Sequence, residues 1–183
     1  MVQPPKVFSK SEVLWEIVLI FLTVGNWHKG FDRLVKGVDK LKDNNVITEE
    51  VIAQIGSGSY KPTNLKVIEY CSPAEFEDIM AKSRVIITHA GIGTIMQSVK
   101  LAKLVVVVPR QAELGECSDN HQWATAEQLE KEGKILVAYE ISELPDKLEQ
   151  AENFIPAKEK SEQGIIQAVE KFLEKLAAKK SNA

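Results

Sequence analysis

The sequence predicts an α/β protein whose core is a Rossmann-like, doubly wound parallel sheet with helices on both faces. Two short runs of β-branched and other apolar residues, 85–88 and 104–108, lack polar alternation, which is typical of strands covered on both faces. Between them lie about fifteen residues, enough for one crossover helix. Loops rich in glycine and polar residues follow several such runs, as expected where strands give way to helices.

The remaining elements alternate in the same way. Strands are expected at 17–24, 51–55, 65–68, 85–88, 104–108 and 135–138. Helices are expected from the apolar spacing at 31–41, at 73–83, after the glycine turn at 89–94, at 120–132 and from 142 to about 149. Ser72 as N-cap, Pro73 in the first turn and Glu75 support the second helix, Gly133 ends the fourth, and Ser142 is expected to cap the fifth.

Length and composition favour one soluble domain. The 183 residues carry a net charge of -3, which gives no general attraction to nucleic acid or to an anionic membrane. The two cysteines, Cys71 and Cys117, fit neither a zinc pattern nor a disulfide framework, so reduced thiols in a cytoplasmic protein are expected. We expect an N-terminal extension at 1–18, the domain at 19–150, and a linker with a final amphipathic helix from near Ser161 at 151–183.

Polar and small residues collect where the strands of the predicted sheet end. Ligands in doubly wound sheets bind beyond the carboxyl ends of the strands, and the loops there are 23–30, 56–59, 88–94 and 109–122. In the turn from His89 to Thr94, two glycines permit a tight bend and let backbone N–H groups approach a phosphate. The alternative is a plain strand-to-helix turn. A nicotinamide fingerprint fails, because Met96 stands where the third glycine belongs.

A second informative stretch runs from Glu113 to Gln122. Asp119, Asn120, His121 and Gln122 follow one another at a predicted helix start, where they offer hydrogen bonds to hydroxyls and phosphates. Asp119 could equally be only an N-cap.

Three segments in this order carry a resemblance to a known family. They are 23–25 with 31–34, then 89–94, then 119–122 followed by Ala124, Leu129 and Gly133. Together they resemble the C-terminal half of GT-B glycosyltransferases, the glycosyltransferase family 28 C-terminal domain. Within it, they are similar to the small nucleotide-sugar-binding subunits of split UDP-N-acetylglucosamine transferases and their bacterial exopolysaccharide counterparts. The similarity covers about residues 19–150.

The resemblance implies a subunit that binds a UDP-sugar while a membrane-anchored partner binds a lipid-linked acceptor. A hexose or N-acetylhexosamine would be transferred with inversion, without a metal or another cofactor and without nucleic acid, by a cytoplasmic protein recruited to the membrane by its partner. A non-catalytic nucleotide-binding regulatory or scaffold protein of the same fold is the alternative, and a small hydrolase or epimerase is a third possibility.

The resemblance also implies the residues of the nucleotide-sugar site. They are Gly25, Asn26, His89, Gly91, Gly93, Thr94, Gln97, Arg110, Glu113, Asn120, His121 and Gln122. Gly91, Gly93 and Thr94 would face the diphosphate, and the 120–122 segment would face phosphate, ribose or sugar hydroxyls. Gln97 stands where related enzymes often have a glutamate that accepts from the ribose. No catalytic base is assigned.

Overall fold

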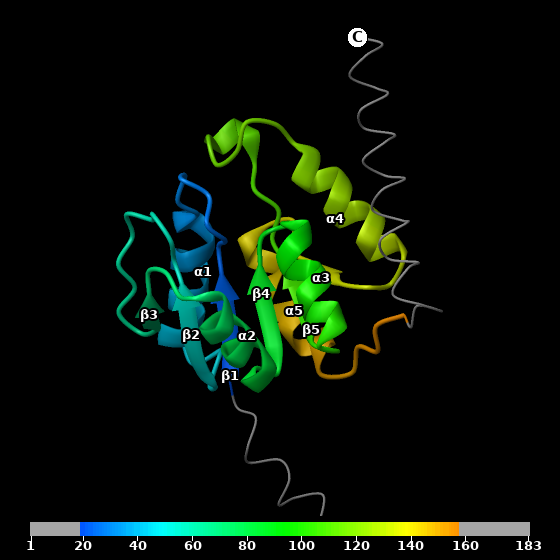
Figure 1. The fold of residues 1–183 in the computed structure, drawn as a ribbon, viewed down its shortest axis with the longest axis horizontal. Coiled ribbons are helices and arrows are strands. Elements are labelled where there is room, and N and C mark those ends of the chain that lie inside the picture. The colour runs from blue at the N-terminus through cyan, green and yellow to red at the C-terminus, as the bar shows by residue number, and fades with distance from the viewer. Residues whose placement is uncertain (1–18, 158–183) are drawn as a thin grey trace, which may run out of the picture.

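The computed structural model describes residues 19–157, which form one six-stranded parallel sheet (Figure 1). The strands are β1 (Leu19–Thr23), β2 (Glu50–Gln54), β3 (Lys66–Ile68), β4 (Val85–Thr88), β5 (Leu104–Val107) and β6 (Leu136–Val137). Their order is β3-β2-β1-β4-β5-β6, with every neighbouring pair parallel. The predicted doubly wound sheet is confirmed. The expected 1–18 extension and the helix from Ser161 lie outside the described residues.

Helices cover both faces of the sheet. They are α1 (Asp32–Asp43), α2 (Pro73–Lys82), α3 (Ile92–Lys100), α4 (His121–Lys131) and α5 (Leu144–Ala151), with short 3-10 turns at Ala112–Leu114 and Ile141–Glu143. In Figure 1, α2 and α3 lie in front of the sheet and α5 lies behind it. Within residues 19–157, no helix is both long and apolar enough to cross a bilayer.

The core alternates between the two faces because successive strand residues point to opposite sides. Ile20 and Leu22 of β1 pack with α1 and α5, whereas Phe21 packs against α2 through Phe76 at a ring distance of 5.2 Å. Burying one such side chain is worth roughly 1.5–3 kcal/mol. The sheet is therefore held from both faces, and its carboxyl edge is a rigid base for the loops that follow.

Capping residues explain two of the helix starts. Before α2, Ser72 accepts from the backbone N–H of Glu75 while the Glu75 carboxylate accepts from Ser72, so the expected cap is confirmed. The expected Ser142 cap is wrong: Ser142 lies inside the 3-10 turn, and α5 begins at Leu144. The turn continues into the helix, and the N–H of Leu144 already donates to the carbonyl of Ile141, so no hydroxyl is needed there.

The chain reverses its winding direction between β1 and β4, which are neighbours in the sheet although β2 and β3 lie between them in sequence. Thr23 pairs in register with Thr88 at the carboxyl ends of these strands. The loop that begins at Gly25 and the turn that begins at His89 therefore start side by side. This is the point where open α/β sheets bind their ligands.

Candidate functional site

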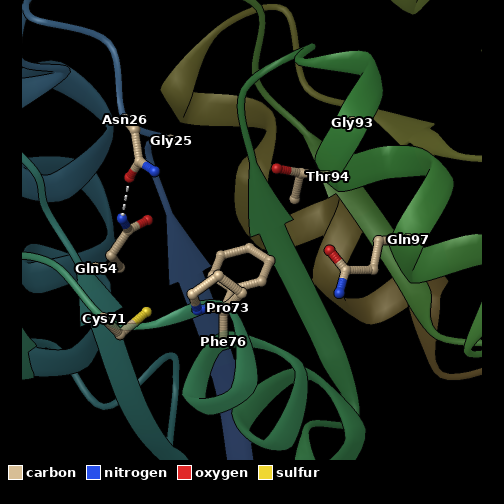
Figure 2. Close-up of a pocket in the computed structure, with 9 residues that line it drawn as sticks. All are labelled: Gly25, Asn26, Gln54, Cys71, Pro73, Phe76, Gly93, Thr94 and Gln97. Carbon is tan, nitrogen blue, oxygen red and sulfur yellow. Dashed lines mark hydrogen bonds between the residues drawn. The ribbon is translucent and has the colours of Figure 1, made fainter.

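An open pocket of about 420 Å³ lies at the point where the winding reverses. It is lined by Gly25, Asn26, Gln54, Cys71, Pro73, Phe76, Gly93, Thr94 and Gln97, which Figure 2 draws. These residues come from the loop after β1, the end of β2, the segment between β3 and α2, the first turn of α2 and the first turns of α3. Cys71 is the one residue among them whose side chain can ionise, and burial raises the pKa of its thiol above the ordinary value. The side chains that line the pocket are therefore uncharged at neutral pH.

The first turn of α3 supplies unused hydrogen-bond donors to this pocket. In the described part of the chain, no group accepts from the N–H groups of Ile92, Gly93 and Thr94, whereas the N–H of Ile95 already donates to the carbonyl of Gly91. Gly93 is exposed, and a Cβ built on it would meet nothing within 4 Å. Free N–H groups and the positive end of the helix dipole favour an anion here.

The two glycines of the turn were expected to permit a tight bend, but the backbone does not require glycine for this. Gly91 has φ -79°, and Gly93 is not among the residues with positive φ, so the bend does not depend on a conformation restricted to glycine. A Cβ at Gly91 would lie 2.3 Å from Nε2 of His89, and one at Gly25 would lie 2.6 Å from Cε1 of the same ring. Gly25 also has φ +73°. The two loops therefore close around the His89 imidazole.

His89 is a neutral side chain in this arrangement. Burial, together with the positive charge of Arg110, lowers the pKa of His89 from 6.5 to about 4. Its Nδ1 lies 3.4 Å from the hydroxyl oxygen of Thr88. The imidazole thus separates the two glycine-containing loops without adding charge to the pocket at neutral pH.

Four lining residues escaped prediction from sequence: Gln54, Cys71, Pro73 and Phe76. Gln54 is the polar last residue of β2 and follows the apolar residues 51–53, and its Nε2 donates to Oδ1 of Asn26 at 2.8 Å. A buried amide at the carboxyl end of a strand was the available signal for Gln54. Pro73 and Phe76 carry no such signal, because a helix start and a core aromatic explain them fully.

Several polar groups of the loop between β5 and α4 pair with one another. Asn120 donates to Glu113 at 2.7 Å and accepts from the backbone N–H of Ala112 at 3.0 Å. The carboxylate of Asp119 accepts from the backbone N–H of His121 and contacts its ring. Asn120 immediately precedes α4 without a side-chain capping bond. Glu113, Asn120 and His121 are exposed and lie outside the lining of the pocket.

Arg110 and Gln122 point inward. Arg110 is 1% exposed and donates to the carbonyls of Val24 at 3.0 Å, Gly30 at 2.8 Å, Lys29 at 3.2 Å and Glu116 at 3.2 Å, with its guanidinium 4.6 Å from the Phe31 ring centre. Gln122 is 3% exposed and accepts from the backbone N–H of Arg110 at 3.3 Å. Arg110 thus joins the loop after β1 to the loop after β5, and its side chain does not line the pocket.

The structure therefore brings together five of the twelve predicted site residues in one pocket. They are Gly25, Asn26, Gly93, Thr94 and Gln97. His89 and Gly91 are not among the lining residues, and the His89 ring packs against Gly25 and Gly91. Within residues 19–157, no three His, Cys, Asp or Glu side chains are grouped so that they could hold a metal ion.

The doubly wound sheet with its site at the β1/β4 junction has the architecture of one half of a GT-B glycosyltransferase. The model of the glycosyltransferase family 28 C-terminal domain matches residues 19–181. The chain belongs to this family. A comparison with curated protein sequences gives no significant match.

Solved structures show the same fold at low sequence identity. The chain is similar to ALG13, known from an NMR solution structure, with a TM-score of 0.59, 18% identity, and coverage of 85% of this chain and 96% of that one. MurG of Acinetobacter baumannii gives a TM-score of 0.53 at 17% identity, covering 86% and 50%. UDP-glucose:anthocyanidin 3-O-glucosyltransferase, solved with UDP, gives 0.55 at 15% identity, covering 92% and 39%.

The chain spans only part of most of these proteins. It covers 38% of the kitacinnamycin glycotransferase, 34% of the calicheamicin glycosyltransferase CalG4 and 39% of SnogD from Streptomyces nogalater. It covers almost the whole of ALG13.

Proposed function

We propose that this chain is the UDP-sugar-binding subunit of a two-part inverting glycosyltransferase. It holds the donor while a separate, membrane-anchored subunit supplies the acceptor-binding half at the cytoplasmic face of a membrane. The sugar, a hexose or an N-acetylhexosamine, passes to a lipid-linked acceptor. Membership of the family and the shared fold support the transferase class.

The observation that carries the proposal is the set of free N–H groups at the start of α3, beside an uncharged pocket. The UDP leaving group gains negative charge as the bond between its terminal phosphate oxygen and the anomeric carbon of the sugar breaks. Preorganised backbone donors and a helix N-terminus stabilise such charge without a metal ion. In this pocket Thr94 adds a hydroxyl next to the same N–H groups.

The two-part arrangement is supported by the likeness of the fold to ALG13. Among the described residues that line the pocket there is no carboxylate or imidazole. We therefore place the base that deprotonates the acceptor hydroxyl on the partner.

Isothermal titration calorimetry with UDP, UDP-N-acetylglucosamine, UDP-galactose and NAD tests the donor site. We expect the uridine nucleotides to bind and NAD not to bind. Gly93→Val should abolish UDP binding, because its side chain would fill the space in front of the free N–H groups, whereas Lys100→Val at the exposed far end of α3 should not. NAD binding without UDP binding would contradict the proposal.

The absence of an acid or base from the pocket lining also favours the second candidate, a nucleotide-binding regulatory or scaffold protein without turnover. Adding the membrane-anchored partner separates the two. Transfer of sugar to a lipid-linked acceptor that requires both chains supports the enzyme subunit. Unchanged nucleotide binding without transfer, in a complex that forms, supports the scaffold.

A further inference from the structure

A chain of hydrogen bonds runs beneath the pocket and ends at Asn26. The N–H of Gly25 donates to the hydroxyl oxygen of Thr23 at 3.3 Å, and that hydroxyl donates to Oε1 of Gln54 at 2.5 Å. Nε2 of Gln54 then donates to Oδ1 of Asn26 at 2.8 Å. Thr23 is 0% and Gln54 1% exposed, so no water competes for these groups.

The burial of Thr23 determines which atom donates and which accepts in each of these hydrogen bonds. Its hydroxyl hydrogen needs an acceptor, because an unsatisfied buried donor is costly. Within the described structure, Oε1 of Gln54 is the acceptor that this hydrogen reaches. If the Gln54 amide were reversed, its NH2 group would face Thr23, and the hydroxyl hydrogen of Thr23 would have no acceptor. Gln54 therefore keeps its oxygen toward Thr23 and its nitrogen toward Asn26.

The orientation of Gln54 in turn orients Asn26. Oδ1 of Asn26 is occupied by the donor from Gln54, so the Asn26 NH2 group is left for a ligand. In Figure 2 the Asn26 nitrogen is turned away from Gln54, toward the open space between the two sides of the pocket. An Asn side chain that was free to rotate could offer either an oxygen or a nitrogen.

We infer that Gln54 is a positioning residue for the UDP-sugar site. Through the hydrogen bonds from Thr23 to Gln54 and from Gln54 to Asn26, it holds the Asn26 side chain so that its NH2 group faces the pocket. The pocket consequently accepts a hydrogen-bond acceptor at this position, such as a phosphate oxygen, and disfavours a donor. The Asn26 NH2 group lies across the pocket from Thr94 and the start of α3, so the two sides present donors to the same anion. The inference rests on the proposed function where the ligand is taken to be UDP.

A double-mutant cycle tests this role by calorimetry with UDP. Gln54→Met keeps the length of the side chain but can neither accept from Thr23 nor donate to Asn26. We expect it to weaken UDP binding about three- to tenfold, as loss of one oriented hydrogen bond would. In an Asn26→Ala background the same change should have an effect below about twofold, because Gln54 acts through Asn26. Gln128→Met, at an exposed glutamine of α4, is the matched control and should leave affinity unchanged.

Urea unfolding of each variant separates stability from binding. An equal loss of UDP affinity from Gln54→Met in both backgrounds overturns the inference, since Gln54 would then act without Asn26.

NMR of the side-chain amides in the full wild-type chain tests the orientation without any ligand. We expect nuclear Overhauser contacts from the Gln54 amide protons to Asn26, and Asn26 amide protons that exchange readily with water. Contacts from the Gln54 amide protons to Thr23, with protected Asn26 amide protons, overturn the inference. This outcome is independent of whether UDP binds, so failure of the proposed function and failure of the positioning role are distinguishable.

Discussion

The turn after β4 and the loop between β5 and α4 lie at the carboxyl edge of the same sheet, but they use their polar groups in opposite ways. The turn leaves the N–H groups of Ile92, Gly93 and Thr94 without acceptors in the described structure. The loop pairs Asn120 with Glu113 and His121 with Asp119. The turn is thus preorganised for an anion, whereas Asn120 and His121 already have hydrogen-bond partners within their own loop.

The loop between β5 and α4 is tied to the loop after β1 through Arg110. Its guanidinium reaches carbonyls on the loop after β1 and on the loop after β5. Arg33 reinforces the tie through Glu116, whose carboxylate accepts at 2.8 and 2.9 Å and also accepts from the N–H of Gln111. The position of the loop after β1, which lines the pocket through Gly25 and Asn26, therefore depends on the loop after β5.

The largest expected effect comes from removing this tie. Arg110→Met removes the donor from the buried carbonyl of Val24 and from three partly buried carbonyls, and we expect the free energy of unfolding to fall by about 3–5 kcal/mol. Urea denaturation followed by circular dichroism measures it. Arg84→Met is the control, because Arg84 forms a more exposed pair with Glu49 and should lose about 1 kcal/mol or less. If the free energy of unfolding fell equally in the two variants, the Arg110 contacts would not stabilise the fold more than an exposed ion pair does.

The pH dependence of stability tests the closure of the two loops around His89. Its pKa in the folded chain is about 4, below the 6.5 of the unfolded chain. The unfolded chain therefore takes up this proton first as the pH falls. The contribution of His89 is complete above pH 6.5 and is lost between pH 6.5 and 4, by up to about 3 kcal/mol. Urea unfolding across this range should show the loss in wild type and in His121→Gln.

A His89→Gln variant should lack this component of the pH dependence. If its stability falls between pH 6.5 and 4 as steeply as that of wild type, His89 is not the group responsible.

Two glycine substitutions in the same turn sharpen the contrast between packing and ligand access. Gly91→Ala places a methyl group against the His89 ring, and we expect a loss of about 1–3 kcal/mol in the free energy of unfolding. Gly93→Ala enters open space inside a helix, and we expect stability to rise by up to about 1 kcal/mol. Thermal unfolding compares them directly. A destabilised Gly93→Ala with an unaffected Gly91→Ala would reverse the roles assigned to the two glycines.

Local patterns were sufficient to predict the elements of the fold. The run at 85–88 coincides with β4, and Ser72 and Glu75 form the capping box at the start of α2, with Pro73 in its first turn. These features depend on residues close in sequence, so their physics is visible in the sequence. The pocket could be anticipated for a related reason: parallel strands bring the loops at their carboxyl ends together whatever the side chains are.

The side chains that failed to reach the pocket depend on distant contacts. Arg110 was expected at the ligand, but acceptors on the loop after β1, about eighty residues earlier in the chain, and the Phe31 ring draw it inward. Gly91 was expected to serve the bend, but its main constraint is the His89 ring. Neither the acceptors of Arg110 nor the position of that ring can be derived from local spacing.

The smallest expected effect concerns the loop between β5 and α4, in which Glu113 and Asn120 are hydrogen-bonded to each other. Glu113 is exposed, and its own backbone N–H, together with the Asn120 amide, lowers its pKa below the ordinary value, so it is ionised and bound to Asn120 at neutral pH. A sugar hydroxyl that uses the Asn120 amide must displace this carboxylate. Glu113→Ala removes the competitor at an exposed site, where stability should change by no more than about 0.5 kcal/mol.

If the proposed function holds, Glu113→Ala should bind UDP-N-acetylglucosamine roughly two- to fivefold more tightly than wild type does, the equivalent of part of one hydrogen bond. Its affinity for UDP should not change, because UDP lacks the sugar. Glu127→Ala, at an exposed glutamate of α4 paired with Lys131, is the control and should alter neither affinity. Weaker binding of the sugar nucleotide by Glu113→Ala would show that Glu113 itself contacts the sugar. The contrast between a turn with free N–H groups and a loop whose polar groups pair with one another would then be wrong.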